Sequence, residues 1–202
     1  MELLDNSVVL ECRSDGISTI GTTLNTTSMN GRRFPEFRYF TRITTISNQF
    51  GTAKWAYIDF RNITSISSAS GINPTNMHIC SFPNVSYADS FPKGRNSWTG
   101  DSATNTAFYM PKVQGFYNIW CNWYNRGVIR WFIVGTQSES IPTLTGGVSA
   151  ENVLSKANFK GFFVPDDMVD DYKADSKWSN VASKIFPISD FESMTGETVP
   201  TE

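Results

Sequence analysis

The residues best suited to recognition chemistry are aromatic side chains near the middle of the sequence. The candidate binding residues are Trp98, Trp120, Trp123, Tyr124 and Trp131. Trp and Tyr rings can stack on the faces of sugars or anchor a protein interface, because each combines a large apolar surface with a polar group. The alternative, to which we give more weight, is that these rings fill a wide coil between Met110 and Val134 or a subunit interface.

Nucleophilic or metal chemistry has little support in the other reactive residues. The single histidine, His78, stands beside Ile79 and Cys80, and the chain lacks a Gly-x-Ser-x-Gly motif, so we interpret it as a structural residue. Cys12, Cys80 and Cys121 are widely spaced, which favours buried thiols in a reducing compartment over a disulfide framework or a zinc site. The sequence therefore predicts no catalytic residues, no metal, no cofactor and no enzyme activity.

A cluster of acidic residues between positions 166 and 175 is the densest charge feature of the chain. Asp167, Asp171 and Asp175 are spaced i, i+4, i+8 and would share one face of a helix. Carboxylate oxygens suit calcium, but the spacing of an EF-hand loop, with its central Gly and distal Glu, is missing. We therefore interpret the cluster as a solvated face that complements the positive end of a helix.

The charge balance argues against nucleic acid as a partner. Lys and Arg number 17 and Asp and Glu 19, the formal net charge is -2, and Arg32–Arg33 is the one basic doublet. A nucleic-acid footprint is a broad basic patch. No stretch approaches the roughly 20 apolar residues of a membrane-spanning helix, and residues 1–7 lack the basic and apolar regions of a signal peptide. We expect neither membrane insertion nor export under a signal of its own.

Internal repetition defines the elements that must position these residues. Four segments share the pattern Φ-x-x-Φ-x-x-Φ, in which Φ is an apolar residue, and the patterns begin at Phe40, Phe60, Phe82 and Met110. The steps between these starts are 20, 22 and 28 residues, and periods of about 20 to 29 residues are typical of leucine-rich repeats. One short strand and its return loop cannot bury an apolar face alone, so successive coils are expected to stack and share one core.

The composition of these segments predicts strands rather than helices. They are rich in Ile, Val, Thr, Phe and Tyr, which favour strands, and Pro83 and Pro111 stand inside two of them, where a helix would break. Turn sequences such as Asn73–Pro74 separate them, so each coil is expected to run strand, turn, strand, loop. Residues 131–134 and 162–164 are two further, degenerate members of the series.

The end of the chain changes character and predicts a helical cap. Residues 165–178 open with a proline and two acids, as helix starts do, and Met168 and Tyr172 lie on one apolar stripe. A second short helix is expected from residue 180 to 185, and a polar tail at 191–202.

These elements divide the chain into four segments. Residues 1–36 form an N-terminal cap or an attachment arm, 37–164 a leucine-rich-repeat-like solenoid of five to six irregular coils, 165–190 a helical C-terminal cap, and 191–202 a tail. The predicted fold class is therefore mainly β with a C-terminal helical cap. A cap is needed because the last coil would otherwise leave the shared core open to water.

Several of these segments resemble a known family. Residues 37–46, 81–85 and 109–113 are similar to BspA-type leucine-rich repeats, which carry an apolar-Pro-x-x-Val/Ile-x-x-Ile phrase in each coil. Residues 161–174 and 178–185 are similar to the terminal cap of the same family, in which a Val-Pro-x-x-x-Val-x-x-Tyr-Lys run is followed by Trp-Ser. The family's Ala-Phe-x-x-Cys turn is present only as a fragment, and the coil lengths vary.

The resemblance implies adhesion or presentation rather than catalysis. The family occurs in surface proteins of gut anaerobes and in virion proteins of their phages. Because the sequence opens without an export signal, we expect a head or tail accessory subunit of a phage particle, made in the host cytoplasm. Its expected partners are other virion proteins, with a host-surface glycan or protein as a further partner. A bacterial cell-surface adhesin is the alternative, and a carbohydrate-active enzyme is a third hypothesis, disfavoured because no acid/base pair stands out.

Overall fold

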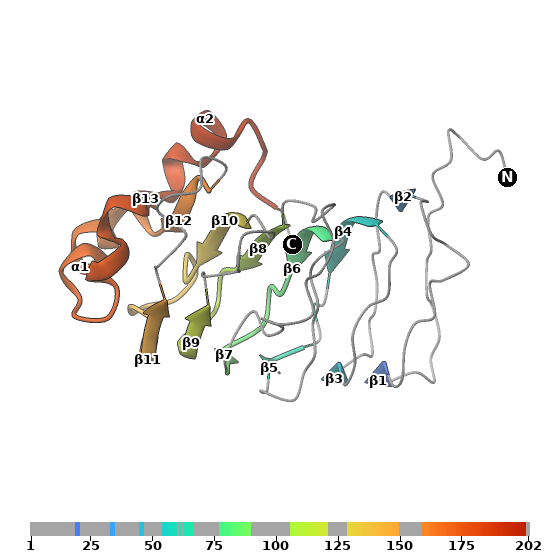
Figure 1. Cartoon of the computed structure of the whole chain (residues 1–202), viewed down its shortest axis with the longest axis horizontal. Helices are drawn as coiled ribbons and strands as arrows, with labels where there is room; N and C mark the ends of the chain where they lie inside the picture. Colours follow the sequence, from blue (N-terminus) through green and yellow to red (C-terminus); the bar gives the residue numbers. More distant parts are fainter. Residues whose placement is uncertain are drawn as a thin grey trace, which may run out of the picture.

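The computed structural model describes residues 19–20, 33–34, 45–46, 54–59, 61, 63–66, 77–89, 106–120, 129–149 and 159–200. Over these residues the chain is mostly strand, its strands pair in parallel, and its short helices follow Pro165 (Figure 1). This confirms the coarse fold class expected from the sequence, a mainly β chain with helices toward the C-terminus.

The larger sheet has seven parallel strands. In chain order they are β2 (Arg33–Phe34), β4 (Lys54–Asp59), β6 (Met77–Ser81), β8 (Thr106–Met110), β10 (Ile129–Val134), β12 (Gly161–Val164) and β13 (Ile185–Pro187). Their spatial order follows the chain order, so each strand lies beside the one that precedes it in this sheet. The segments 131–134 and 162–164, predicted as degenerate members of the series, are confirmed as strands β10 and β12.

The smaller sheet has four parallel strands. They are β5 (Ser65–Ile66), β7 (Tyr87–Ala88), β9 (Gly115–Trp120) and β11 (Thr143–Ser149), again in chain order. A separate pair joins β1 (Thr19–Ile20) to β3 (Thr45–Ile46). Because β1 and β2 precede residue 37, strand pairing extends into the segment that the sequence set apart as an N-terminal cap or arm.

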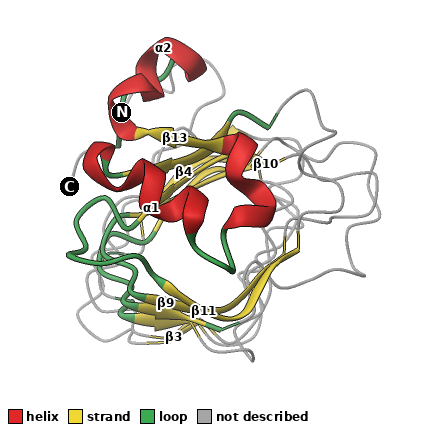
Figure 2. Cartoon of the chain, turned by 90° about the vertical axis from the view of Figure 1, so that its left-hand side faces the viewer, coloured by secondary structure: helices red, strands yellow, loops and turns green. Residues whose placement is uncertain are grey.

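The two large sheets face each other across one core (Figure 2). The repeated pattern places its first apolar residue at or just after a strand of the larger sheet and its last in the smaller sheet. Two complete patterns are fully buried, namely Phe82, Val85 and Ala88, and Met110, Val113 and Phe116. In the smaller sheet Ile66, Ala88 and Phe116 are aligned on neighbouring strands. The described part of the repeat is therefore in register, and its apolar positions share one core.

Pro83 and Pro111 occupy turns between the two sheets. The backbone N–H of Val85 donates to the carbonyl of Phe82 over 3.3 Å, and the turn Met110–Val113 repeats this bond at 3.4 Å. Each proline is therefore the second residue of a four-residue turn, a position that needs φ of about −60°, which the proline ring presets. The prolines that argue against a helix in the sequence thus form the corners between strands.

Helices cover one end of the core (Figure 2). They are η3 (Asp166–Met168), α1 (Val169–Ala174) and η4 (Ser179–Lys184). Tyr172 and Trp178 are fully buried, with ring centroids 5.1 Å apart, and Trp178 packs edge-on against Phe162 at 5.6 Å. The helix predicted at 180–185 differs, because the 3-10 helix η4 ends at Lys184 and the chain then enters β13. Among the described residues, no helix combines the length and apolarity needed to cross a membrane.

The cap also engages the edge of the smaller sheet. The indole N–H of Trp178 donates to the carbonyl of Pro142 over 3.2 Å, and the side-chain amide of Asn180 donates to the carbonyl of Val148 over 2.6 Å. Both acceptors lie along or just before β11, which is the edge strand of that sheet. The cap therefore satisfies backbone groups that no further strand pairs with.

The last residues differ from the tail predicted at 191–202. η5 (Ile188–Asp190) leads into α2 (Phe191–Thr195), and Phe191 is fully buried. Beyond α2, Val199 packs against the same apolar cluster as Phe191. We call residues 191–199 the C-terminal clasp. The mostly polar composition of this segment concealed a packing role that a few apolar side chains provide.

Candidate functional site

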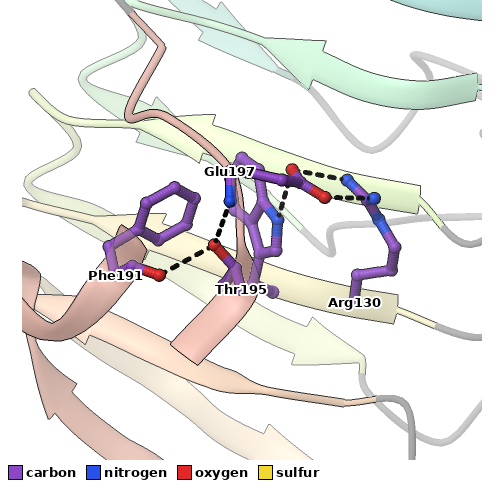
Figure 3. Close-up of polar contacts among 5 residues, drawn as sticks. Arg130, Phe191, Thr195 and Glu197 are labelled. Atoms are coloured by element: carbon purple, nitrogen blue, oxygen red, sulfur yellow. Dashed lines mark hydrogen bonds and ion pairs between the residues drawn. The ribbon is translucent and has the colours of Figure 1, made fainter. Parts of the chain in front are cut away.

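Trp131 lies beneath the C-terminal clasp rather than at the surface. Only 1% of the residue is exposed, and its ring packs edge-on against Phe191 with centroids 4.8 Å apart. Its indole N–H donates to the Glu197 carboxylate over 3.1 Å (Figure 3). Trp131 is therefore a packing residue, which is the second of the two roles considered for it in the sequence analysis.

A polar network fastens the clasp. Glu197 accepts two hydrogen bonds from the Arg130 guanidinium, one of them 2.8 Å from Nη2 to Oε2 (Figure 3). The Thr195 hydroxyl donates to the carbonyl of Phe191 over 2.7 Å and accepts the backbone N–H of Glu197 over 3.1 Å. Gly196 adopts a φ of 72°, a left-handed conformation that suits glycine at a helix end. These contacts turn the chain so that Glu197 reaches the sheet.

The clasp covers the outer face of the larger sheet, opposite the main core. That face carries the buried side chains of Ala107, Tyr109, Trp131, Ile133 and Phe163. Phe191 packs among them, and the partly buried Met194 and Val199 add to the cover. A ligand could reach this surface only by displacing residues 191–199.

The remaining aromatic candidates are not brought together by the described structure. Trp120 ends β9, and its side chain lies outside the described residues, as do Trp98, Trp123 and Tyr124. The exposed aromatic rings among the described residues are instead Tyr87 and Tyr117, which are 44% and 45% exposed.

Tyr87 and Tyr117 belong to the outer face of the smaller sheet. We define the tyrosine face as Ser65, Tyr87, Gly115, Tyr117, Thr143 and Thr145. The five residues other than Gly115 are exposed, whereas the alternate residues Ile66, Phe116 and Leu144 point into the core. The pleat of the sheet thus separates an apolar inner row from an outer row of hydroxyl groups, rings and one glycine.

One row of the tyrosine face crosses all four strands. Ser65 pairs with Tyr87, Tyr87 with Gly115, and Gly115 with Thr143. A Cβ at Gly115 would lie 3.2 Å from Cδ2 of Tyr87 and 3.0 Å from Oγ1 of Thr143. The Tyr87 ring therefore extends over Gly115 toward Thr143, and the missing side chain is what makes room for it.

Tyr117 stands beside an irregularity in the edge strand. Phe116 pairs with Leu144 and Asn118 with Gly147, so Tyr117 faces two residues of β11, a β-bulge. Gly147 has a φ of 104°, and a Cβ built there would meet no atom within 4 Å. A side chain at Gly147, just past the bulge, would therefore meet no neighbouring atom.

Asp89 borders the tyrosine face. Its backbone N–H donates to the carbonyl of Ile66 over 2.7 Å, so the strand ladder continues one residue past β7. Since Ala88 pairs with Phe116, this extension brings Asp89 beside Tyr117. None of the six residues of the tyrosine face is charged. The carboxylate of Asp89 lies at the margin of this face.

The acidic cluster of the cap has structural partners. The helix predicted to align Asp167, Asp171 and Asp175 is interrupted, because Asp175 follows the end of α1 with extended backbone. The Asp175 carboxylate accepts the backbone N–H groups of Lys177 and Trp178 over 2.8 and 3.1 Å, which fixes the turn that buries Trp178. Within the described ranges, no group of three or more His, Cys, Asp and Glu side chains is arranged to hold a metal ion.

The other reactive residues have ordinary positions. His78 lies within β6, and Cys80 is fully buried in the main core, as expected for a small apolar residue. Burial raises the pKa of the Tyr172 phenol well above its ordinary value. Cys12 and Cys121 lie outside the described residues.

The sequence contained a signal for the tyrosine face that composition alone does not reveal. Tyr87 and Tyr117 occupy positions next to the last Φ of their repeats, Ala88 and Phe116. An aromatic residue outside the Φ positions cannot point into the shared core while its neighbour does.

No known protein family, curated protein or solved structure matches the chain.

Proposed function

We propose that this chain is a non-enzymatic structural or attachment subunit of a phage particle, and that it is a BspA-type, leucine-rich-repeat-like solenoid. The observation that carries the proposal is the register of successive repeats across two facing sheets, which makes a platform with one continuous core. Such a platform suits a protein that presents a surface, because its outer faces can vary while the buried positions hold the shape.

The strand spacing supports the solenoid. Asp59, Ser81, Tyr109, Ile133, Phe163 and Phe186 are consecutive partners in the larger sheet. The differences between these residue numbers are 22, 28, 24, 30 and 23, close to the period of about 20 to 29 residues in leucine-rich repeats. Each repeat from Phe60 to Phe116 supplies a strand to both sheets, as expected for a coil that closes on the next.

The surface chemistry supports attachment. The tyrosine face presents rings and hydroxyl groups on regular strands, and Tyr can supply rigid contact area with little loss of side-chain entropy. The outer face of the larger sheet is occupied by the C-terminal clasp over β8, β10 and β12, so we assign recognition to the smaller sheet.

Mass spectrometry of purified particles tests the proposal. The chain should be present at a fixed ratio to the major capsid protein in particles banded on a density gradient, and should remain after a high-salt wash. Enrichment in the envelope fraction of uninfected cells, with none in the particles, would instead support a bacterial cell-surface adhesin.

A further inference from the structure

We infer that the tyrosine face binds a neutral glycan, with Tyr87 and Tyr117 as the stacking platforms. The inference rests on the proposed attachment function and names its ligand class. The two rings lie on adjacent strands and two residues apart along the sheet, since Tyr87 pairs with Gly115. Strand spacing and residue rise place them about 8 Å apart, so both rings can contact one short saccharide chain.

The chemistry around the rings suits a polyhydroxylated ligand. A Tyr ring offers a flat, electron-rich face that packs against the C–H groups on one side of a pyranose ring. The hydroxyl groups of that sugar project from its edge and need both donors and acceptors. Ser65 and Thr145 provide hydroxyl groups that can do either. The Thr143 hydroxyl donates to the carbonyl of Gln114 over 3.4 Å and can still accept a hydrogen bond. The Tyr rings thus match the apolar face of a sugar, and the hydroxyl groups around them match its polar edge.

Two glycine positions leave the rings accessible. Gly115 lets the Tyr87 ring extend over the sheet instead of being held away from it. The bulge beside Tyr117 contains Gly146, and Gly147 follows it with open space around its Cβ position. Glycines within strands mark places where a ligand or another backbone approaches closely.

The charge pattern selects the class of glycan. The tyrosine face itself is uncharged, and Asp89 places a carboxylate at its margin. Lys112, in the turn before β9, donates from Nζ to the side chain of Asn84 over 2.9 Å. The six residues of the tyrosine face therefore offer no cation to pair with the acidic group of a sialylated, sulfated or uronic glycan.

The size of the face argues for a glycan over a protein partner. Four strands about 4.8 Å apart and about three residues in length cover on the order of 200 Å². A stable protein interface buries about 800 Å² on each partner. The six residues of the tyrosine face thus match the footprint of a short saccharide, and they include none of the aliphatic side chains found at the centre of a protein interface.

Isothermal titration calorimetry of the full chain tests the inference. The probes are hexasaccharides of glucose in α and β linkage, mannose and N-acetylglucosamine, compared with sialyllactose, oligogalacturonate and a heparin hexasaccharide. We expect saturable binding of at least one neutral probe. Tyr87→Ala and Tyr117→Ala should each weaken it at least about tenfold, as loss of a central aromatic contact does.

Matched variants separate stacking from other effects. Tyr87→Phe and Tyr117→Phe retain the rings and should change affinity no more than about fivefold, the value of one hydrogen bond. Lys173→Ala, at an exposed position of α1, should leave binding unchanged. All variants are exposed, so their melting temperatures should match that of the parent chain.

Three results would overturn the inference: no binding of any neutral probe, binding that survives the Tyr87→Ala/Tyr117→Ala double variant, or tighter binding of the anionic probes. Capture of a protein through the same face, without glycan binding, would also overturn it. These outcomes are independent of the particle proposal, because a chain that co-purifies with particles can fail to bind sugars, and a sugar-binding chain can be absent from particles.

Discussion

At the scale of single residues, Trp178 shows how one side chain closes the core. Its backbone N–H is fixed by Asp175, its indole N–H donates to Pro142, and its ring contacts Tyr172. The sequence predicts the burial of such a residue, because a large ring near an apolar helical stripe belongs inside. It does not predict the partner carbonyl, which belongs to Pro142, 36 residues earlier in the chain and just before β11.

Trp178→Ala should destabilise the protein by about 3 to 5 kcal/mol, because it removes a fully buried ring and leaves a cavity. Asp171→Ala, at an exposed position of α1, should change the free energy of unfolding by less than about 0.5 kcal/mol. Urea denaturation of the two variants and the parent chain measures both values. Equal unfolding midpoints would contradict the structure of the cap.

The Tyr172 hydroxyl is buried and has no hydrogen-bond partner among the described residues. Tyr172→Phe should therefore leave the stability unchanged at neutral pH or raise it by up to about 1 kcal/mol, since no bond is lost. The raised pKa also predicts a pH effect. The unfolded chain releases this proton near the ordinary value of about 10, before the folded chain does, so the parent loses stability as the pH rises past that value.

The variant should lack this loss. Unfolding at pH 7 and at about pH 10.5 compares the two proteins, and the difference between them should grow at the higher pH in favour of Tyr172→Phe. Parallel behaviour of the parent and the variant would show that the phenol is solvated.

At the scale of elements, the strands were predictable and the clasp was not. The repeated apolar pattern predicts the strands. Phe82 and Met110 hold the same position in this pattern, and the strands beside them are neighbours in the larger sheet. The clasp depends on Phe191, Met194 and Val199, which follow no strand or helix period long enough to detect. Its polar anchor, Glu197, pairs with Arg130, and no local pattern connects residues so far apart in the chain.

Glu197→Gln should loosen the clasp. The variant loses the charge that two guanidinium N–H groups share and weakens the bond from Trp131, which we expect to cost about 1 to 3 kcal/mol. Glu192→Gln, on the exposed side of α2, is the matched control and should have little effect. Limited proteolysis and hydrogen exchange of residues 191–199 report the loosening, and equal protection in both variants would contradict the proposed anchor.

At the scale of the whole molecule, one core holds both sheets together, so damage in one repeat should affect both. Met110→Ala removes a fully buried side chain beside Phe132 and Phe82 in the core and should cost about 2 to 5 kcal/mol. Gln114→Ala, an exposed position four residues later, should cost less than about 0.5 kcal/mol. A single cooperative transition for Met110→Ala, followed by circular dichroism and by Trp fluorescence, is expected. Two separate transitions would show that the sheets fold independently.

The tyrosine face also marks how far sequence reasoning reaches at this scale. The repeat period tells which residues are inside, but the aromatic residues near the middle of the chain were weighed by type alone. Trp131 and Tyr117 both belong to that region. Trp131 lies buried under the clasp, whereas Tyr117 is exposed to solvent. The position of Tyr117 next to the last Φ of its repeat indicates its exposure, whereas the contact of Trp131 with residues 191–199 has no signal in the sequence.

The carbonyls of Pro142 and Val148 make the β11 edge of the smaller sheet unlike an open strand edge, because side chains of the cap already donate to both. A strand from another molecule that paired with β11 would have to displace the Trp178 indole and the Asn180 amide from these carbonyls. The addition of a strand to this edge of the smaller sheet is therefore opposed by side chains of the same chain.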